Sequence, residues 1–303
     1  MTAGTSMQAI DVSVVIAVKN EEVYLESAVL SVLQQQGVNH EVIVVDDGST
    51  DRTPEILKRL AAEQPRLRVF RNPRAGKCSA FNLGIEQSTG TFACLFAGDY
   101  IMPPGSLAER WAAVRDHGGG AATVGLSKIL TMSEDKRFDG HLVPRAKGRG
   151  ALSGQSPLMN RAALAKIFPV PESLPNEDTW MELAVLHFPD WSVIHGDIVC
   201  CHWRHHAGNS INHSVGFDVY NRKITARMRA LALFDEKYGS ELGERNRQAL
   251  AGKVRCEAAR SSGDLLGVLR SPIAVVDRLR ALSITNALFY GVRQRLYGLL
   301  SGW

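Results

Sequence analysis

Residues 12–51 read VSVVIAVKNEEVYLESAVLSVLQQQGVNHEVIVVDDGSTD, and this stretch decides the fold class. Residues 12–18 form a β-branched apolar run, which predicts a buried strand. Residues 21–36 repeat apolar side chains at helical spacing and end at Gly37, so they predict a helix. A second apolar run at 41–45 predicts another strand. Strand, helix and strand in this order are typical of a parallel unit with a crossover helix.

The same alternation continues beyond this unit. Further elements are predicted as a helix at 53–62, a strand at 67–70, a helix at 77–87 and a strand at 91–96. Apolar strands that alternate with helices call for a mostly parallel sheet covered on both faces. We therefore expect an α/β fold of the Rossmann-like kind, with its ligands at the carboxyl ends of the strands.

Beyond residue 99 the pattern is less regular. Predicted elements are helices at 107–114, 161–167 and 177–186, and strands at 121–130 and 191–203. Residues 133–154 are polar and rich in glycine and basic side chains, which indicates a functional or mobile loop. From residue 214 onward the sequence predicts helices only, through residue 300.

Composition limits the classes of protein that remain. With 303 residues, 45% hydrophobic and 22% charged, the chain is typical of a folded globular protein. It has no apolar run near the roughly 18–20 residues that span a bilayer, and residues 1–10 lack a signal-peptide pattern. We expect a cytoplasmic protein whose five cysteines are reduced thiols.

The net charge of +4 is unevenly distributed. Residues 204–303 hold 16 basic and 8 acidic side chains, whereas residues 1–203 hold 19 basic and 23 acidic ones. A basic C-terminal third can face nucleic acid, an anionic membrane surface or solvent, and charge alone does not choose among them.

The predicted strand ends carry polar side chains. Asp46 and Asp47 follow the second strand as adjacent carboxylates, which repel each other and need a reason to coexist there. Ser49 and Asp51 next to them are equally consistent with simple helix capping. Residues 72–77 place cations at a predicted helix N-terminus, which suits a nucleotide or phosphate, although a solvated basic turn is the alternative.

Three later positions are also candidates. Asp99 follows the fourth strand, where a carboxylate could hold Mg²⁺ or Mn²⁺ against a diphosphate. Asp178 opens an apolar helix and is either a complement to the helix dipole or a general base. Residues 200–206 are rich in Cys and His but lack the spacing of a zinc site, so an imidazole contact with a diphosphate is favoured.

Taken together, these segments resemble the family 2 inverting glycosyltransferases with the GT-A fold. The matching segments occur in the family's order: VSVVIAVKNEE (12–22), EVIVVDDGSTD (41–51), GKCSAFNLGIEQSTG (76–90), AGDYIMP (97–103), GQSPLMNRAAL (154–164), NEDTW (176–180) and WRHHAGNS (203–210). They cover residues 12–210. The resemblance implies a GT-A catalytic domain at 1–213, with a nucleotide-sugar half at about 10–100 and an acceptor half at about 101–213, and a helical extension at 214–303.

The resemblance also implies a reaction. One sugar moves from a nucleotide-sugar, with UDP expected, to an acceptor hydroxyl by a single displacement that inverts the configuration. Asp178 is the implied general base, Gln155 and Glu177 the implied acceptor contacts, and Asp99 and His206 the implied ligands of Mg²⁺ or Mn²⁺. The implied nucleotide-sugar contacts are Ala17, Lys19, Asn20, Glu21, Asp46, Asp47, Lys77, Asn82, Asp99 and His206.

The chain departs from the family's pattern in two places. Residues 96–99 read FAGD where many members have Asp-x-Asp-Asp, which leaves metal dependence open. Ala17 and Lys19 replace the common Pro and Tyr of the first strand end, so base stacking there is not expected. The absence of a QxxRW-type motif favours transfer of a single sugar over processive synthesis.

Two other functions stay open, a nucleotidyltransferase and a nucleotide-sugar-binding protein with lost or weak catalysis. Residues 265–303 interleave arginines with large apolar side chains. They fit an interfacial helix that meets the inner membrane surface and a lipid-linked or other carbohydrate acceptor, or a helix packed on the catalytic domain or on a homodimer partner. A nucleic-acid partner is not expected.

Overall fold

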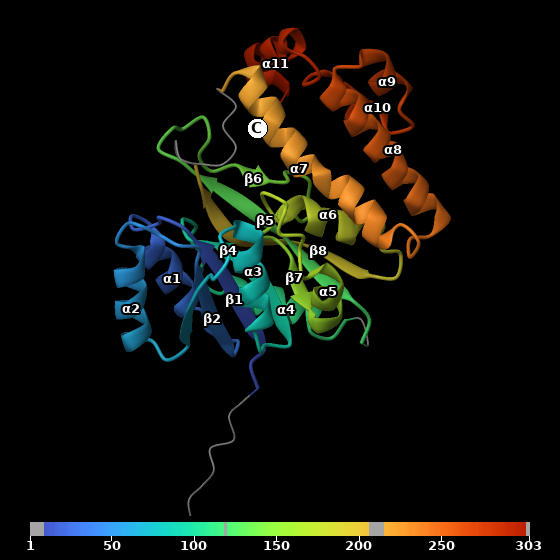
Figure 1. Ribbon diagram of the computed structural model, residues 1–303. Coiled ribbons are helices and arrows are strands. Elements are labelled where there is room, and N and C mark those ends of the chain that lie inside the picture. Colours follow the sequence, from blue (N-terminus) through green and yellow to red (C-terminus); the bar gives the residue numbers. More distant parts are fainter. Residues whose placement is uncertain (1–8, 118–119, 206–214, 301–303) are drawn as a thin grey trace, which may run out of the picture. The chain divides into compact units, whose positions relative to one another are not determined.

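The computed structural model describes residues 9–117, 120–205 and 215–300, the last four of these as backbone only. The chain divides into two compact units (Figure 1). The first comprises residues 1–172 and 190–205, and the second comprises residues 173–189 and 206–303. This grouping differs from the expected boundary at 213/214, because the helix that begins at Asp178 packs against helices of the C-terminal segment.

The first unit is built on a mixed sheet with the strand order β3-β2-β1-β4-β7-β5-β6, in which β8 also pairs with β5. Its strands are β1 (Val12–Val18), β2 (His40–Asp46), β3 (Leu67–Arg71), β4 (Phe92–Ala97), β5 (Thr123–Met132), β6 (Leu142–Val143), β7 (Leu158–Asn160) and β8 (Ser192–Arg204). β1 runs parallel to β2 and β4, and β2 runs parallel to β3. The predicted α/β fold with alternating strands and helices is confirmed.

Helices cover both faces of this sheet. The helices of the first unit are α1 (Leu25–Leu33), α2 (Thr53–Glu63), α3 (Lys77–Glu86), α4 (Ser106–Val114) and α5 (Arg161–Ile167). Side chains of α1, α2 and α4 form one buried cluster with the even-numbered residues of β1, such as Val14 and Ile16. On the opposite face α3 approaches β1 closely, since a Cβ on Gly84 would lie 2.2 Å from Cγ1 of Val15. This packing holds the carboxyl ends of β1, β2 and β4 in fixed register.

Three elements differ from the sequence predictions in this unit. The helix predicted at 21–36 begins at Leu25, because residues 19–22 are held in a turn by the loop after β2. β7 was not predicted, since its three residues are too few to show a period. The long loop predicted at 133–154 contains the short strand β6, which pairs with β5.

In the described part of the second unit, all regular elements are helices. Its helices are α6 (Asp178–His187), α7 (Phe217–Tyr238), α8 (Glu244–Ser262), α9 (Leu265–Arg270), α10 (Val275–Leu282) and α11 (Ala287–Leu300). An aromatic core joins α6 to α7, with the rings of Trp180 and Phe234 5.1 Å apart. α8 ends where Gly263 adopts a positive φ of 79°, and Asp264 then caps α9 by accepting a hydrogen bond from the Gly267 amide.

Within the described residues, no helix combines the length and the apolar character needed to cross a bilayer.

Candidate active site

The turns that follow β1 and β2 are bound to each other. The amides of Asn20 and Glu21 donate to the hydroxyls of Ser49 and Thr53, each at 2.9 Å. In return, Asn20 Oδ1 accepts a hydrogen bond from the Thr50 amide at 2.8 Å. Asn20 has a positive φ of 57°, a conformation that asparagine tolerates better than most residues. These contacts fix the backbone at the strand ends before any ligand binds.

Glu21 is the acid at the centre of these strand ends. Burial first, and then the nearby charges of Asp99 and Asp51, together raise the pKa of Glu21 to about 7. Gly98 provides the room for this side chain: a Cβ there would lie 3.2 Å from Cγ of Glu21 and 2.7 Å from Cγ1 of Val18. An aspartate at position 98 would therefore force these neighbours to move.

Asp46 and Asp47 are both buried, with 6% and 8% of their surface exposed. One oxygen of each is used by the fold. Asp46 Oδ1 accepts from the Ser49 amide at 2.9 Å, and Asp47 Oδ1 accepts from Asn72 Nδ2 at 2.7 Å and from the Gly76 amide at 2.8 Å. These bonds explain how two adjacent carboxylates coexist here. Among the residues that the structure describes, neither Oδ2 atom accepts a hydrogen bond, so both can accept one from a ligand.

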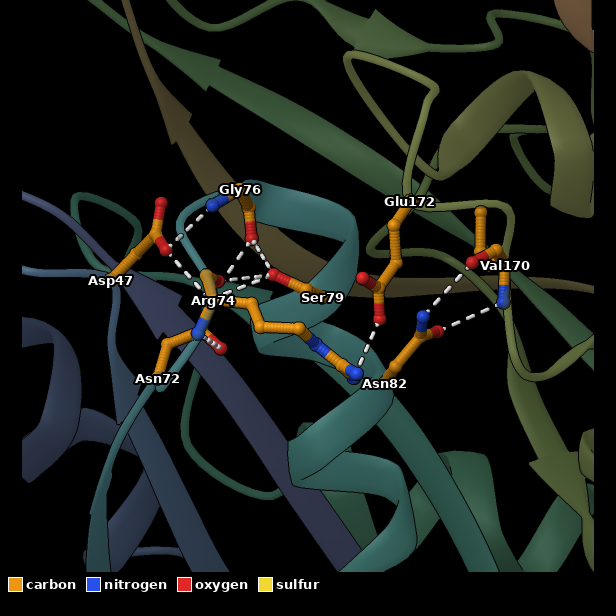
Figure 2. Close-up of polar contacts among 8 residues, drawn as sticks. All are labelled: Asp47, Asn72, Arg74, Gly76, Ser79, Asn82, Val170 and Glu172. Carbon is orange, nitrogen blue, oxygen red and sulfur yellow. Dashed lines mark hydrogen bonds and ion pairs between the residues drawn. The ribbon is translucent and has the colours of Figure 1, made fainter.

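Asp47 thereby shapes the turn before α3 (Figure 2). Asn72 Nδ2 also donates to Ser79 Oγ at 2.8 Å, and Ser79 Oγ donates to the carbonyl oxygens of Arg74 and Gly76. Gly76 has a φ of 142°, which favours glycine at this position. The N-terminus of α3 is thus positioned by a carboxylate from the end of β2.

Two residues of this region bind the segment that follows α5 (Figure 2). Asn82 donates to the carbonyl of Val170 at 2.9 Å and accepts from its amide at 2.8 Å. Arg74 forms an ion pair with Glu172 at 2.8 Å. Both side chains therefore hold a loop in place, which differs from the nucleotide contact expected for Asn82. That expected contact stays a prediction.

The structure describes four other predicted site residues. Ala17 is half-buried near the end of β1, and Lys19 is exposed in the turn that follows. Lys77 opens α3, with its ammonium 5.5 Å from the centre of the Phe81 ring. Gln155 is half-buried in the turn before β7. His206 lies outside the described residues.

Sequence reasoning missed Arg204. This residue ends β8, and its Nε donates to the carbonyl oxygen of Asp99 at 3.1 Å while its guanidinium lies 4.3 Å from the centre of the Tyr24 ring. The structure thus brings a cation to the end of β4. Its place at the end of a predicted strand, directly before two histidines, was the signal that could have identified it.

In the second unit, Asp178 is the first residue of α6. Its Oδ1 accepts a hydrogen bond from the Thr179 amide at 2.8 Å, and its Oδ2 forms a short ion pair with Arg227 of α7. Arg227 Nε also donates to Thr179 Oγ1 at 3.0 Å. The carboxylate of Asp178 is therefore held in one orientation. Glu177 is buried, with 1% of its surface exposed.

The segment that contains these strand ends matches a known protein family. Residues 13–161 match the sequence model of the family described as glycosyl transferase family 2. The chain carries a family 2 glycosyltransferase domain. The matched residues include β1 to β4 and the polar turns that follow them.

Curated relatives of this family 2 domain match over limited lengths. An uncharacterized glycosyltransferase of Haemophilus influenzae is 35% identical over 100 residues, which make up 33% of this chain and 40% of that protein. The beta-monoglucosyldiacylglycerol synthase of Synechocystis is 39% identical over 97 residues, or 30% of this chain and 20% of that protein. The chain thus spans less than half of either relative.

Solved structures extend the likeness to the fold of most of the chain. Staphylococcus aureus TarS 1-349 in complex with UDP-GlcNAc aligns with a TM-score of 0.62 and 18% identity, covering 95% of this chain and 91% of that one. The mannosyltransferase PcManGT of Pyrobaculum calidifontis, in complex with GDP-Man and Mn²⁺, aligns with a TM-score of 0.52 and 17% identity, covering 97% and 88%. The fold is that of the GT-A glycosyltransferases.

The residues of the family 2 domain fit a divalent cation only in part. Within the described residues, no group of three or more His, Cys, Asp or Glu side chains could hold a metal ion. Asp99 offers one carboxylate, and Gly98 occupies the position of a further acid in the family's pattern. A cation at Asp99 would therefore take most of its ligands from diphosphate oxygens and water.

Proposed function

We propose that this chain is an inverting glycosyltransferase that moves one sugar from a UDP-sugar to an acceptor hydroxyl. The observation that carries the proposal is the preformed edge at the carboxyl ends of β1, β2 and β4. There the family 2 segment places the buried carboxylates of Asp46 and Asp47, whose Oδ2 atoms can accept hydrogen bonds from a ligand. The likeness of the fold to a protein solved with UDP-GlcNAc supports a uridine nucleotide.

The nucleotide contacts follow from donor and acceptor chemistry. Asp47 Oδ2 and Asp46 Oδ2 accept hydrogen bonds from a base N–H or from ribose hydroxyls. Lys77 at the N-terminus of α3 supplies positive charge for the diphosphate, and the partial positive charge of the helix dipole at that end acts in the same sense. The nucleotide base contacts the end of β1 and the turn after it, which Ser49 and Thr53 hold in place. The residues of this contact are Ala17, Lys19, Asn20 and Glu21.

The transfer step needs a base and a stabilised leaving group. Asp178 removes the proton from the acceptor hydroxyl, whose oxygen attacks C1 of the sugar on the face opposite the nucleotide, so the configuration inverts. The ion pair with Arg227 keeps the Asp178 carboxylate oriented for this role. Arg204 adds positive charge beside Asp99, where the diphosphate departs.

A divalent cation bound at Asp99, with His206 as the proposed second ligand, would neutralise charge on the leaving diphosphate. Gln155 and Glu177 are proposed as contacts of the acceptor. A lipid-linked or carbohydrate acceptor at the inner face of a membrane is supported by the exposed apolar and basic side chains of the C-terminal helices.

The experiment that tests donor binding is a thermal-shift screen of UDP-, GDP-, CMP- and TDP-sugars with and without Mn²⁺. We expect the UDP-sugars to raise Tm most, because a ligand that binds only the folded state stabilises it in proportion to occupancy. Asp47→Ala should abolish the shift, whereas Asp116→Ala, at an exposed position, should leave it unchanged. Equal shifts with all four nucleotides would contradict the choice of UDP.

A second candidate is a nucleotide-sugar-binding protein that has lost catalysis. Gly98 in place of an acid favours it, because a weaker cation site stabilises the leaving diphosphate less. The two candidates differ in one measurement: release of UDP from a UDP-sugar in the presence of Mn²⁺ requires turnover and argues for the enzyme.

A further inference from the structure

The second unit contains a cavity of about 920 Å³ among α6, α7, α8 and α10. This volume falls within the range of about 300–1,000 Å³ that is common for ligand pockets. On α6 its lining residues are Thr179, Glu182, Leu183 and Leu186, whose spacing of three and four places them on one helix face. The cavity wall therefore begins one residue after Asp178.

Most of the remaining wall is apolar. From α7 come Ile224, Met228 and Leu231, again at helical spacing. From α10 come Val276 and Leu279, which line the cavity although 58% and 60% of their surface is exposed. α10 buries none of its residues. A hydrocarbon chain in the cavity would cover this apolar surface and gain about 25 cal/mol for each Å² removed from water.

Cations also line the cavity, and not all of them are neutralised. Arg227 is paired with Asp178, and Arg260 is paired with Glu257. Lys253 forms no ion pair or hydrogen bond with the described residues. Arg293 donates to Ser283 Oγ at 2.9 Å, but its Nε is buried without a hydrogen-bond partner among the described residues. A buried guanidinium N–H without a partner is costly, and an anion in the cavity would satisfy it.

Three acids line the cavity, and none of them opposes an anion strongly: Glu257 and Asp277 are paired with Arg260 and Arg280, and the pKa of Glu182 is raised. Burial comes first among the causes that raise the pKa of the Glu182 carboxyl, and the charges of Asp178 and Asp277 act in the same direction against Lys253 and Arg227. Raising this pKa reduces the tendency of Glu182 to carry a negative charge. The cavity therefore combines an apolar wall with positively charged side chains that can bind an anion.

We propose that this cavity binds the acceptor as an anionic lipid, with the hydrocarbon chain between α7 and α10 and the phosphate near Lys253 and Arg293. Arg227 links the cavity to the chemistry, since its guanidinium lines the cavity and also holds Asp178 and Thr179. The inference rests on the proposed transferase function, because it assigns the acceptor of that reaction. It names an occupant for a cavity that the donor site does not explain.

The test is calorimetric titration of the full chain with octyl phosphate below its micelle concentration. We expect saturable binding, with inorganic phosphate and octyl glucoside binding much more weakly, since each supplies half of the recognised chemistry. Lys253→Gln should weaken octyl phosphate binding about tenfold, the effect of removing one charged hydrogen-bond donor. Ile224→Trp, which fills the apolar part, should weaken it further, and Lys253→Arg should retain it.

The matched control is Lys223→Gln, which removes the same charge from an exposed position of α7 outside the cavity and should leave binding within twofold. Circular dichroism melts identify any variant that fails to fold. Absence of octyl phosphate binding, or binding that neither Lys253→Gln nor Ile224→Trp changes, overturns the proposal. Because UDP-sugar binding is measured separately, such a failure is distinct from a failure of the transferase function.

Discussion

Glu21 shows how a single side chain at the strand ends can make the stability of the fold depend on pH. Its pKa of about 7 results from burial first, and then from the charges of Asp99 and Asp51. In the unfolded chain a glutamate ionises near pH 4.3. Between these values the folded protein retains a proton that the unfolded chain releases, so stability falls as pH rises from about 4.5 to 7.

Glu21→Gln should therefore stabilise the protein at pH 8 by about 2 kcal/mol and have little effect at pH 4.5. The measurement is the free energy of unfolding in urea at both pH values. Glu55→Gln, at an exposed position of α2, is the control and should not change the pH dependence. An equal effect of Glu21→Gln at both pH values would show that the carboxyl is not perturbed.

A second prediction about a single residue concerns the general-base role proposed for Asp178. Asp178→Asn keeps the size of the side chain but cannot accept the proton, so kcat should fall by about 10²–10⁴-fold. The thermal shift with a UDP-sugar should persist, because Asp178 is not among the proposed nucleotide contacts. Asp218→Asn, at an exposed position of the same unit, should leave kcat unchanged. Full activity of Asp178→Asn would remove this residue from the mechanism.

At the scale of elements, the site is made by turns that bind one another. The turn after β1 is bound by the turn after β2, and the turn before α3 is bound by Asp47. The alternation of strands and helices predicted that these turns share one edge of the sheet. It did not predict that Asn82 would hold the backbone of Val170, which lies 88 positions away.

Lys128 of β5 binds the backbone of the loop at 133–154, and the effect of this contact on stability can be tested. Lys128 has a side chain only 2% exposed, and its Nζ donates to the carbonyls of Pro144 and Ala146, both at 2.7 Å. It also pairs with Asp197 at 3.3 Å. Lys128→Met should cost about 2–3 kcal/mol, because two carbonyls lose a charged donor.

The loop itself should then open to protease. Limited digestion with trypsin is expected to cut faster at the exposed Lys147 and Arg149 in Lys128→Met than in the parent chain. Lys136→Met, which changes an exposed lysine of the same loop, serves as the control. Unchanged cleavage rates would show that the loop is held by other contacts.

At the scale of the whole molecule, the exposed apolar side chains concentrate in the C-terminal helices. Leu266 and Leu288 are 61% and 73% exposed, and basic residues such as Arg270 and Arg295 lie in the same helices. This combination supports attraction to an anionic bilayer. It supports equally C-terminal helices that are covered by a second copy of the chain. The first hypothesis predicts binding to lipid vesicles, and the second predicts a dimer.

Sedimentation with lipid vesicles distinguishes membrane binding from self-association. The parent chain should sediment with phosphatidylglycerol vesicles, more weakly with phosphatidylcholine, and less at high salt. The double substitution Leu266→Asp and Leu288→Asp should lower the affinity about tenfold or more. Val23→Asp is the control, because Val23 is 75% exposed but belongs to the first unit. A concentration-dependent dimer that does not sediment would instead favour self-association.

The sequence by itself determined the alternation of strands and helices, the edge of the sheet at which a ligand was expected, and Asp46 and Asp47 as residues of that edge. It could do so because hydrophobic periodicity and turn chemistry are local and act within a few residues. Only the tertiary structure decided that Arg204 meets Asp99 across 105 positions, that Gly98 makes room for Glu21, and that α6 joins the C-terminal helices around a cavity. Such contacts depend on the path of the chain and on close packing between distant segments, and no local pattern records them.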